Sequence, residues 1–151
     1  MRKKDKEIKD KKEIEEIIKK AIALRIAMSE NNMPYIVPVC FGYKENYLFF
    51  HSAPEGKKID IIKKNNNVAF EIDVDLKLVK DKIGCKWGME YKSVIGIGKA
   101  FFIEDLKEKE EALKIIMKQY SDETFDFNNI NNVVVVKIKI EAMTGKKSKY
   151  F

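Results

Sequence analysis

Short segments rich in β-branched and aromatic residues recur along this chain, and most neighbouring segments are separated by a few turn-forming residues. This composition is typical of β-strands, and short turns between neighbouring strands favour antiparallel pairing. The sequence therefore predicts a mainly β protein, a six-stranded antiparallel barrel with flanking helices packed outside it. The six predicted strands are residues 24–28, 34–41, 47–51, 68–72, 93–102 and 133–140.

Three segments predict helices. Apolar residues over residues 14–22 follow the spacing of one face of an amphipathic helix, and charged residues occupy the opposite face. Residues 106–120 repeat this pattern. A shorter helix, with Ile59 and Ile62 on one side, is predicted to end at the asparagines of residues 65–67.

Two features do not fit a regular sheet. Pro38 lies inside a predicted strand, although proline cannot donate a hydrogen bond to a neighbouring strand. It indicates an edge strand, a bulge, or a place where something other than a strand covers the backbone. Residues 75–90 contain the only tryptophan, Trp87, and are predicted as a long connection, of a length that is more often functional than idle.

The size of the chain indicates one domain over residues 1–151, with residues 1–12 as a basic N-terminal extension. No apolar stretch approaches the ~20 residues that cross a bilayer, so no membrane partner is expected. The charged N-terminus is not followed by the apolar segment of a secretion signal. We therefore expect a cytoplasmic protein in which Cys40 and Cys85 are reduced and have mainly packing roles.

The net charge of +6 is concentrated at the two ends of the chain. Residues 1–12 hold seven basic and three acidic side chains, and residues 145–151 hold three lysines and no acid. The rest of the chain is close to neutral. This distribution indicates solvated basic tails rather than a nucleic-acid-binding face, so no nucleic acid partner is expected.

The segment from His51 to Lys58 carries the strongest local indication of a binding site. Ser52 and Glu55 have the spacing of a capping box, which predicts a helix that begins here. Such a helix would direct free N–H groups and the positive end of its dipole at one point. Lys57 and Lys58 oppose that dipole unless an anion is bound, and phosphate is the obvious anion. The alternative is an ordinary surface helix in a lysine-rich protein.

His51 is the only histidine, which excludes a metal site built from several histidines, and no metal is predicted. A single histidine at a strand end does not establish a Ser-His-Asp or Cys-His arrangement. His51 is therefore the one catalytic candidate, with a structural role as the alternative. Gly96 and Gly98 lie in a predicted strand and lack the third glycine and following helix of a dinucleotide-binding motif.

Three stretches, in this order, are distinctive: YIVPVCFGY, LFFHSAPEGKKIDIIKKNNNVAFEID and CKWGMEYKSVIGIGKA. They resemble the pyridoxamine 5′-phosphate oxidase-like FMN-binding split barrels, and most of all the branch that contains the nitroimidazole-resistance proteins. The stretch EAMTGK near the end of the chain also resembles this family. The resemblance extends from about Ile14 to Thr144. It implies a split-barrel fold and a homodimer with FMN in a cleft at the subunit interface.

The resemblance also implies which residues would contact FMN. A strand end and the following basic pair would hold the phosphate, the strand with the unusual proline would carry the flavin ring, and the partner subunit would contribute from a later strand. The phosphate residues are His51, Ser52, Lys57 and Lys58; the ring residues are Val37, Pro38 and Val39; the partner residue is Ser93, with Lys92 beside it; Cys85, Trp87 and Tyr91 would wall the cleft.

The function implied by the resemblance is an FMN-dependent oxidoreductase that passes electrons to a small acceptor, a nitroaromatic in this branch. Vitamin B6 oxidation is not expected, because the Arg-Lys pair of the oxidase is replaced by two lysines and the basic cluster for a vitamin phosphate is missing. The alternative is a non-enzymatic module that binds flavin or haem for sensing or storage. A basic nucleic-acid-binding barrel is a third interpretation.

Overall fold

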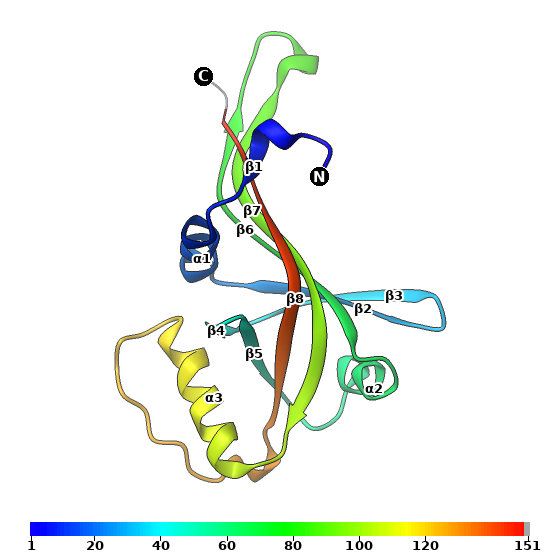
Figure 1. Cartoon of the computed structure of the whole chain (residues 1–151), viewed down its shortest axis with the longest axis vertical. Helices are drawn as coiled ribbons and strands as arrows, with labels where there is room; N and C mark the ends of the chain where they lie inside the picture. The colour runs from blue at the N-terminus through cyan, green and yellow to red at the C-terminus, as the bar shows by residue number, and fades with distance from the viewer. Residues whose placement is uncertain (150–151) are drawn as a thin grey trace.

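The computed structural model describes residues 1–149, and its centre is one eight-stranded antiparallel sheet (Figure 1). Seven strands pair in the order β3-β2-β6-β7-β8-β5-β4, and β1 pairs with β8 beside this path. The strands are β1 (Glu7–Ile8), β2 (Leu24–Glu30), β3 (Met33–Val39), β4 (Gly42–Lys44), β5 (Tyr47–Ser52), β6 (Asn67–Val79), β7 (Gly88–Ile103) and β8 (Val134–Ser148).

The helices pack against the sheet. The α-helices are α1 (Lys11–Lys20), α2 (Lys57–Lys64) and α3 (Leu106–Lys118), and short 3-10 helices occupy Lys4–Lys6, Gly84–Lys86 and Ile130–Asn132. Among the described residues, no helix is long and apolar enough to cross a membrane.

The sheet curls into a barrel because its two edge strands are consecutive in the chain. β3 ends at Val39 and β4 begins at Gly42, so two residues connect one edge of the sheet to the other. A link of that length reaches roughly 10 Å. The predicted antiparallel barrel is therefore confirmed, with eight strands instead of six. The additional strands, β1 and β4, are two and three residues long, too short for an alternating pattern.

The larger hydrophobic core fills the inside of this curved sheet. Strand residues alternate between the core and the outer face, and α1 and α2 add their apolar sides to the core. Phe41, Phe50 and Phe70 are its largest fully buried side chains. A second cluster packs α3 against β5 and β8 around Leu113 and Ile116.

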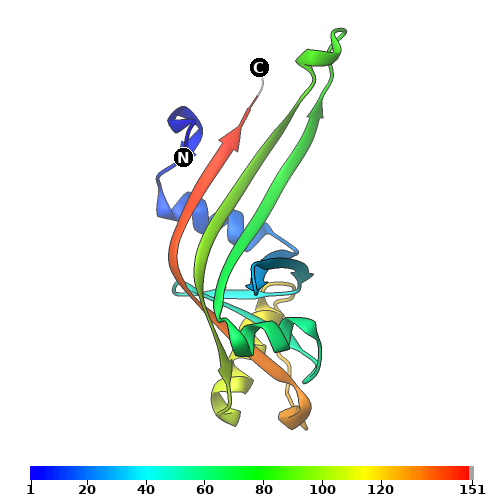
Figure 2. The same cartoon turned by 90° about the vertical axis from the view of Figure 1, so that its right-hand side faces the viewer.

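Residues 75–90 are not a long connection, which corrects the prediction. β6 continues to Val79 and β7 begins at Gly88, and the two strands pair across a bulge between Val74 and Lys77. They form an arm that projects beyond the barrel (Figure 2). Backbone hydrogen bonds hold these strands together, and most of their side chains are exposed. Because neither face of the arm is buried, its sequence does not need to alternate between apolar and polar residues, and the strands are hard to recognise.

The predicted capping box is also wrong. Ser52 is the last residue of β5, so it cannot cap a helix that begins beside it. α2 begins at Lys57, and its N-cap is Gly56. No side chain caps this helix. Gly56 has a φ of 139°, which L residues with a side chain rarely adopt, so a glycine conformation makes the turn from strand to helix. Lys57 and Lys58 nevertheless lie in the first turn of the helix, as predicted, because they are its first two residues.

Pro38 lies in β3, an edge strand that pairs only with β2. Of the three explanations for this proline, the edge strand is therefore the one observed. The predicted packing roles of Cys40 and Cys85 are wrong, because both thiols are exposed. Cys40 lies in the two-residue link between the sheet edges, and Cys85 lies at the tip of the arm, where no other element covers it.

The basic ends of the chain are not simply solvated tails. Glu7 and Ile8 pair with Lys146 and Gly145 of β8, and Ile8 is only 3% exposed. A Cβ atom at Gly145 would lie 2.9 Å from the Cβ atom of Ile8, so β1 packs directly on the β8 backbone. Tyr150 and Phe151, the last residues of the predicted C-terminal tail, lie outside the described residues.

Replacement of Gly42 by alanine is expected to destabilise the fold by about 1–3 kcal/mol. A Cβ atom there would lie 2.6 Å from the carbonyl oxygen of Ile115, so α3 would have to move away from β4. Gly84→Ala is the matched control, since no atom lies within 4 Å of its added Cβ. The free energy of unfolding in urea measures both variants. Equal stabilities would contradict this account of α3 packing.

Candidate functional site

The start of α2 lies against the edge strand β3. The Nζ atom of Lys57 is 4.8 Å from the centre of the Tyr35 ring, a distance typical of a cation–π contact. The structure therefore brings Lys57, one member of the basic pair, next to the strand that contains Pro38.

The residues of β3 divide between two faces. Tyr35, Val37 and Val39 are partly buried and pack on the core, whereas Ile36 and Pro38 are exposed on the outer face. Because β3 pairs only with β2, its other backbone edge has no strand partner. Pro38 can therefore contact a ligand on the outer face with its side chain, and Val37 and Val39 can do so through their backbone.

Tyr120, the last residue of the predicted helix 106–120, holds the chain in place just after the end of β3. Its hydroxyl accepts a hydrogen bond from the Phe41 N–H at 2.9 Å and donates one to the Ile22 carbonyl at 3.0 Å. Burial raises the pKa of the Tyr120 hydroxyl above its usual value. The two-residue link that closes the barrel is thereby tied to the end of α3 and the start of β2.

His51 and Ser52 lie on opposite faces of β5. Ser52 is 7% exposed and points to the same side as Phe50, into the core, whereas His51 is exposed. The two residues are adjacent in the sequence, and adjacent strand residues point in opposite directions. The structure therefore does not direct both side chains at one point.

Ser93 and Trp87 are not near β3 within one chain. β2 and β6 separate β3 from β7, which corresponds to roughly 14 Å across the sheet. Trp87 precedes β7 at the tip of the arm, where its Nε1–H donates to the carbonyl of Asp81 at 2.7 Å. A single chain thus holds the predicted phosphate and ring residues on one side and Ser93 and Trp87 on the other.

On the outer face of the sheet, β7 carries exposed apolar side chains that no element within residues 1–149 covers. Ile95 is 55% exposed and Ile97 is 54% exposed, although both are central residues of the long strand β7. Ile97 lies between Ala69 of β6 and Ala142 of β8. Exposed apolar side chains that are contiguous on one face indicate an interaction surface.

A charged cluster lies on the same outer face beside this apolar surface. Nη1 of Arg25 is 2.9 Å from Oδ1 of Asp73 and 3.4 Å from Oε2 of Glu71. Partial burial raises the pKa of the Glu71 carboxyl, and the nearby Asp73 adds to this rise while Arg25 opposes it. This cluster is not predictable from the sequence, because only the strand register brings Arg25 opposite Pro38 and Glu71.

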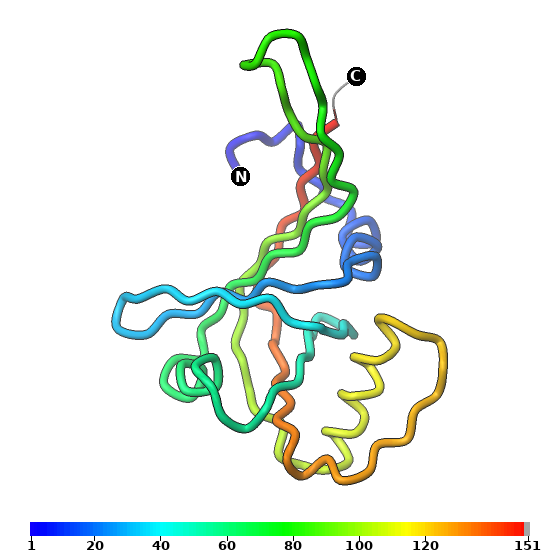
Figure 3. The backbone as a smooth tube through the Cα atoms, turned by 180° about the vertical axis from the view of Figure 1, so that it is seen from behind, coloured from blue at the N-terminus to red at the C-terminus, as the bar shows by residue number. Residues whose placement is uncertain are grey.

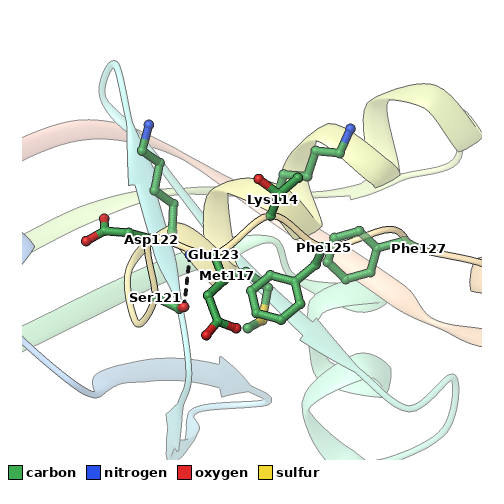
Figure 4. A pocket seen from close by; sticks show the side chains of 9 residues that line it. Lys114, Met117, Ser121, Asp122, Glu123, Phe125 and Phe127 are labelled. Atoms are coloured by element: carbon green, nitrogen blue, oxygen red, sulfur yellow. Dashed lines mark hydrogen bonds between the residues drawn. The ribbon is translucent and has the colours of Figure 1, made fainter.

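Two cavities lie away from β3 and the start of α2. One, of about 380 Å³, lies between α3 and the loop after it, where Met117, Phe125 and Phe127 form its apolar lining (Figure 4). The other, of about 310 Å³, lies at the base of the arm and includes Tyr91 and Lys92. No group of three or more His, Cys, Asp or Glu residues within residues 1–149 could hold a metal ion.

Comparison with known proteins identifies the family. The sequence profile named for pyridoxamine 5′-phosphate oxidase matches residues 10–147 of this chain. The chain belongs to the pyridoxamine 5′-phosphate oxidase family. No curated protein matches the chain at a significant level.

A solved relative within this family is a candidate 5-nitroimidazole antibiotic resistance protein of Bacteroides thetaiotaomicron. It is 40% identical, the match covers 93% of this chain and 86% of the relative, and the TM-score is 0.84. The predicted resemblance to this branch is confirmed.

More distant structures show the fold alone. A flavocytochrome of Azotobacter vinelandii is 15% identical with a TM-score of 0.85, and the match covers 99% of this chain and 72% of the flavocytochrome. An FAD- and haem-binding protein of Mycobacterium smegmatis is 14% identical with a TM-score of 0.86, and the match covers 97% of this chain and 75% of that protein. The sheet of this family member is therefore a split barrel.

Proposed function

We propose that this protein is an FMN-dependent oxidoreductase that acts as a homodimer and reduces a small nitroaromatic acceptor. The observation that carries this proposal is the position of Lys57 at the start of α2, directly beside the edge strand β3. A basic residue at a helix start beside an edge strand supports a phosphate site there, and the 40% identical relative of the same family is a candidate nitroimidazole-resistance protein.

The phosphate of FMN would bind at the first turn of α2. The first hydrogen bond of the helix is donated by Asp60 to Gly56, so the N–H groups of Lys57, Lys58 and Ile59 have no partner within the helix. No side chain caps them, which leaves these donors available to an anion. The two ammonium groups add charge-assisted hydrogen bonds, each of which contributes about 1.5–3 kcal/mol.

The flavin ring would lie along the free backbone edge of β3, at Val37, Pro38 and Val39. A second copy of the chain would then cover it, with Ile95 and Ile97 in the contact and Ser93 near the ring. Two features support the homodimer: the exposed apolar surface on β7, and the separation of Ser93 from β3 within one chain. The exposed Trp87 would wall the cleft from the arm.

The flavin, when bound, supplies the redox chemistry, and the protein supplies binding and orientation and excludes water. Lys57 and Lys58 bind the phosphate, while Pro38 and the backbone of β3 orient the ring. We assign no acid or base: His51 is exposed, but it lies on the face of β5 opposite to Ser52. The acceptor class is proposed from the description of the 40% identical relative.

The first test is a visible absorption spectrum of the purified protein, followed by acid release of any chromophore. We expect a yellow protein that releases about one FMN per chain and that oxidises a reduced nicotinamide when a nitro compound is present. Tight FMN binding without turnover would instead support a module for sensing or storage. A colourless protein that does not take up added FMN would overturn the phosphate site, the ring site and the redox function together.

A further inference from the structure

Three basic segments that are far apart in the sequence lie side by side at one end of the molecule. β1 pairs with the end of β8, and the end of β8 pairs with β7 at the base of the arm. Figures 1 and 3 show the N-terminal segment, the end of β8 and the arm at this same end. We call this surface, formed by residues 1–12, 75–92 and 145–149, the basic end.

The basic end carries far more positive charge than the chain as a whole. Residues 1–12 hold seven basic and three acidic side chains, residues 75–92 hold five and three, and residues 145–149 hold three lysines. The total is fifteen basic and six acidic side chains, a net charge of +9. Because the whole chain has a net charge of +6, the remaining residues have a net charge of −3. The charge of the folded protein is therefore strongly polarised.

Several acidic groups at or beside this end already have partners inside the protein. Asp75 pairs with Lys20 and lies 3.9 Å from the ammonium of Lys92, and its pKa is lowered mainly by the hydrogen bond from Lys20. The carboxylate of Asp81 accepts a hydrogen bond from the N–H of Ile83 at 2.8 Å.

The arm lysines, in contrast, are available to a partner. The side chains of Lys77, Lys80, Lys82 and Lys86 are all exposed. Among residues 1–149, no hydrogen bond or ion pair occupies their ammonium groups.

We propose that the basic end is the docking surface for an acidic electron-carrier protein that can reduce the flavin, as an electron donor in addition to a reduced nicotinamide. This inference rests on the proposed redox function, which requires an electron donor. Ser93 follows Lys92 in the sequence, and in the sheet it lies directly opposite Lys146 of β8. The basic end therefore adjoins the strand that is proposed to contact the flavin, so a carrier bound there would be close to the cofactor.

The size of the surface favours a protein over a small anionic cofactor. From Gly88 to Lys92 alone, β7 extends roughly 13 Å, and the rest of the arm, the N-terminal segment and the end of β8 widen the surface further. Exposed lysines steer an oppositely charged protein and support a weak, salt-sensitive complex, which is typical of electron-transfer partners. A polyanion such as DNA or a membrane would also be attracted, but neither supplies electrons.

The test measures binding of a small acidic iron–sulfur protein, a bacterial ferredoxin, to the full chain without flavin. The variant replaces Lys77, Lys80, Lys82 and Lys86 with glutamine. The matched control replaces Lys44, Lys63, Lys107 and Lys139, which are exposed lysines outside the basic end, with glutamine. Each variant loses four positive charges. The affinity is measured by calorimetry at about 0.01 M and about 1 M ionic strength, where the Debye length is about 30 Å and about 3 Å.

We expect the arm variant to bind ferredoxin at least about tenfold more weakly than the control at low ionic strength. We also expect the binding of the unmodified protein to be lost at high ionic strength. Equal affinities of the two variants, or the absence of ferredoxin binding at low ionic strength, would overturn the proposal. So would arm-dependent binding to duplex DNA or to vesicles with phosphatidylserine but not to ferredoxin.

Because the binding measurement uses protein without flavin, it is independent of the proposed function. A protein that binds FMN but does not dock ferredoxin refutes only the docking surface. A protein that fails to take up FMN refutes the proposed function, whatever the ferredoxin result. FMN uptake by the arm variant, at the affinity of the control, also shows that the four substitutions leave the fold intact.

Discussion

Replacement of both Lys57 and Lys58 by alanine is expected to weaken FMN binding by about 100-fold or more. Two charge-assisted hydrogen bonds contribute about 3 kcal/mol at the low end of their usual range, which is about two factors of ten in affinity. The low end applies because Lys57 is exposed and water screens its charge. Quenching of flavin fluorescence during titration of the flavin-free protein measures the dissociation constant.

The control for this experiment is the Lys44→Ala, Lys63→Ala double variant, which loses the same charge at exposed positions away from the start of α2. Its FMN affinity should equal that of the unmodified protein. The affinity of the Lys57 and Lys58 variant should also depend less on salt, because two of the charges that attract the phosphate are gone. Normal FMN affinity in the Lys57→Ala, Lys58→Ala variant would remove the phosphate site from the start of α2.

Replacement of Ile97 by aspartate is expected to convert the proposed dimer to a monomer and to abolish FMN retention. Ile97 lies at the centre of the exposed apolar surface, between Ala69 and Ala142. In the dimer, a carboxylate at this position would lose its hydration shell without gaining a hydrogen bond or an ion pair. This would raise the free energy of the dimer by several kcal/mol per charge. Light scattering should show a mass of 17.6 kDa instead of about twice that value.

Ile22→Asp is the matched control, since Ile22 is 80% exposed and lies outside this surface. It should remain dimeric and retain FMN. A monomeric Ile97→Asp protein that still binds FMN tightly would keep the phosphate site but refute the shared cleft. A dimer that persists in the Ile97→Asp variant would place the subunit interface elsewhere on the molecule.

The sequence predicted the fold class and most elements where side chains alternate between a buried and an exposed face. β2 and the two long helices are predicted correctly because their apolar residues follow the periods of a strand and of a helix. The arm was missed because its strands are held by backbone hydrogen bonds and leave most of their side chains exposed. The start of α2 was misplaced because the sequence motif of a capping box does not show that Gly56 makes the turn.

The candidate site was only partly predictable for a related reason. The basic pair at residues 57–58 was recognised as a local feature, since a helix start and its charges are adjacent in the chain. That Lys57 reaches Tyr35 of β3 depends on how α2 packs against the sheet. The opposite directions of His51 and Ser52 depend on the strand register, which also places Arg25 beside Glu71 and Asp73.

What the sequence determined by itself is therefore local: strand and helix periods, a proline at position 38 that does not fit a central strand, and a basic pair suited to an anion. The tertiary structure alone decided which of these features meet. It joined the two sheet edges through a two-residue link, left Ile95 and Ile97 uncovered, and brought the basic ends of the chain together. The physical reason is that the spacing of apolar residues shows which side of a helix or strand is buried. Contacts between distant elements depend instead on strand order and register, which no local pattern specifies.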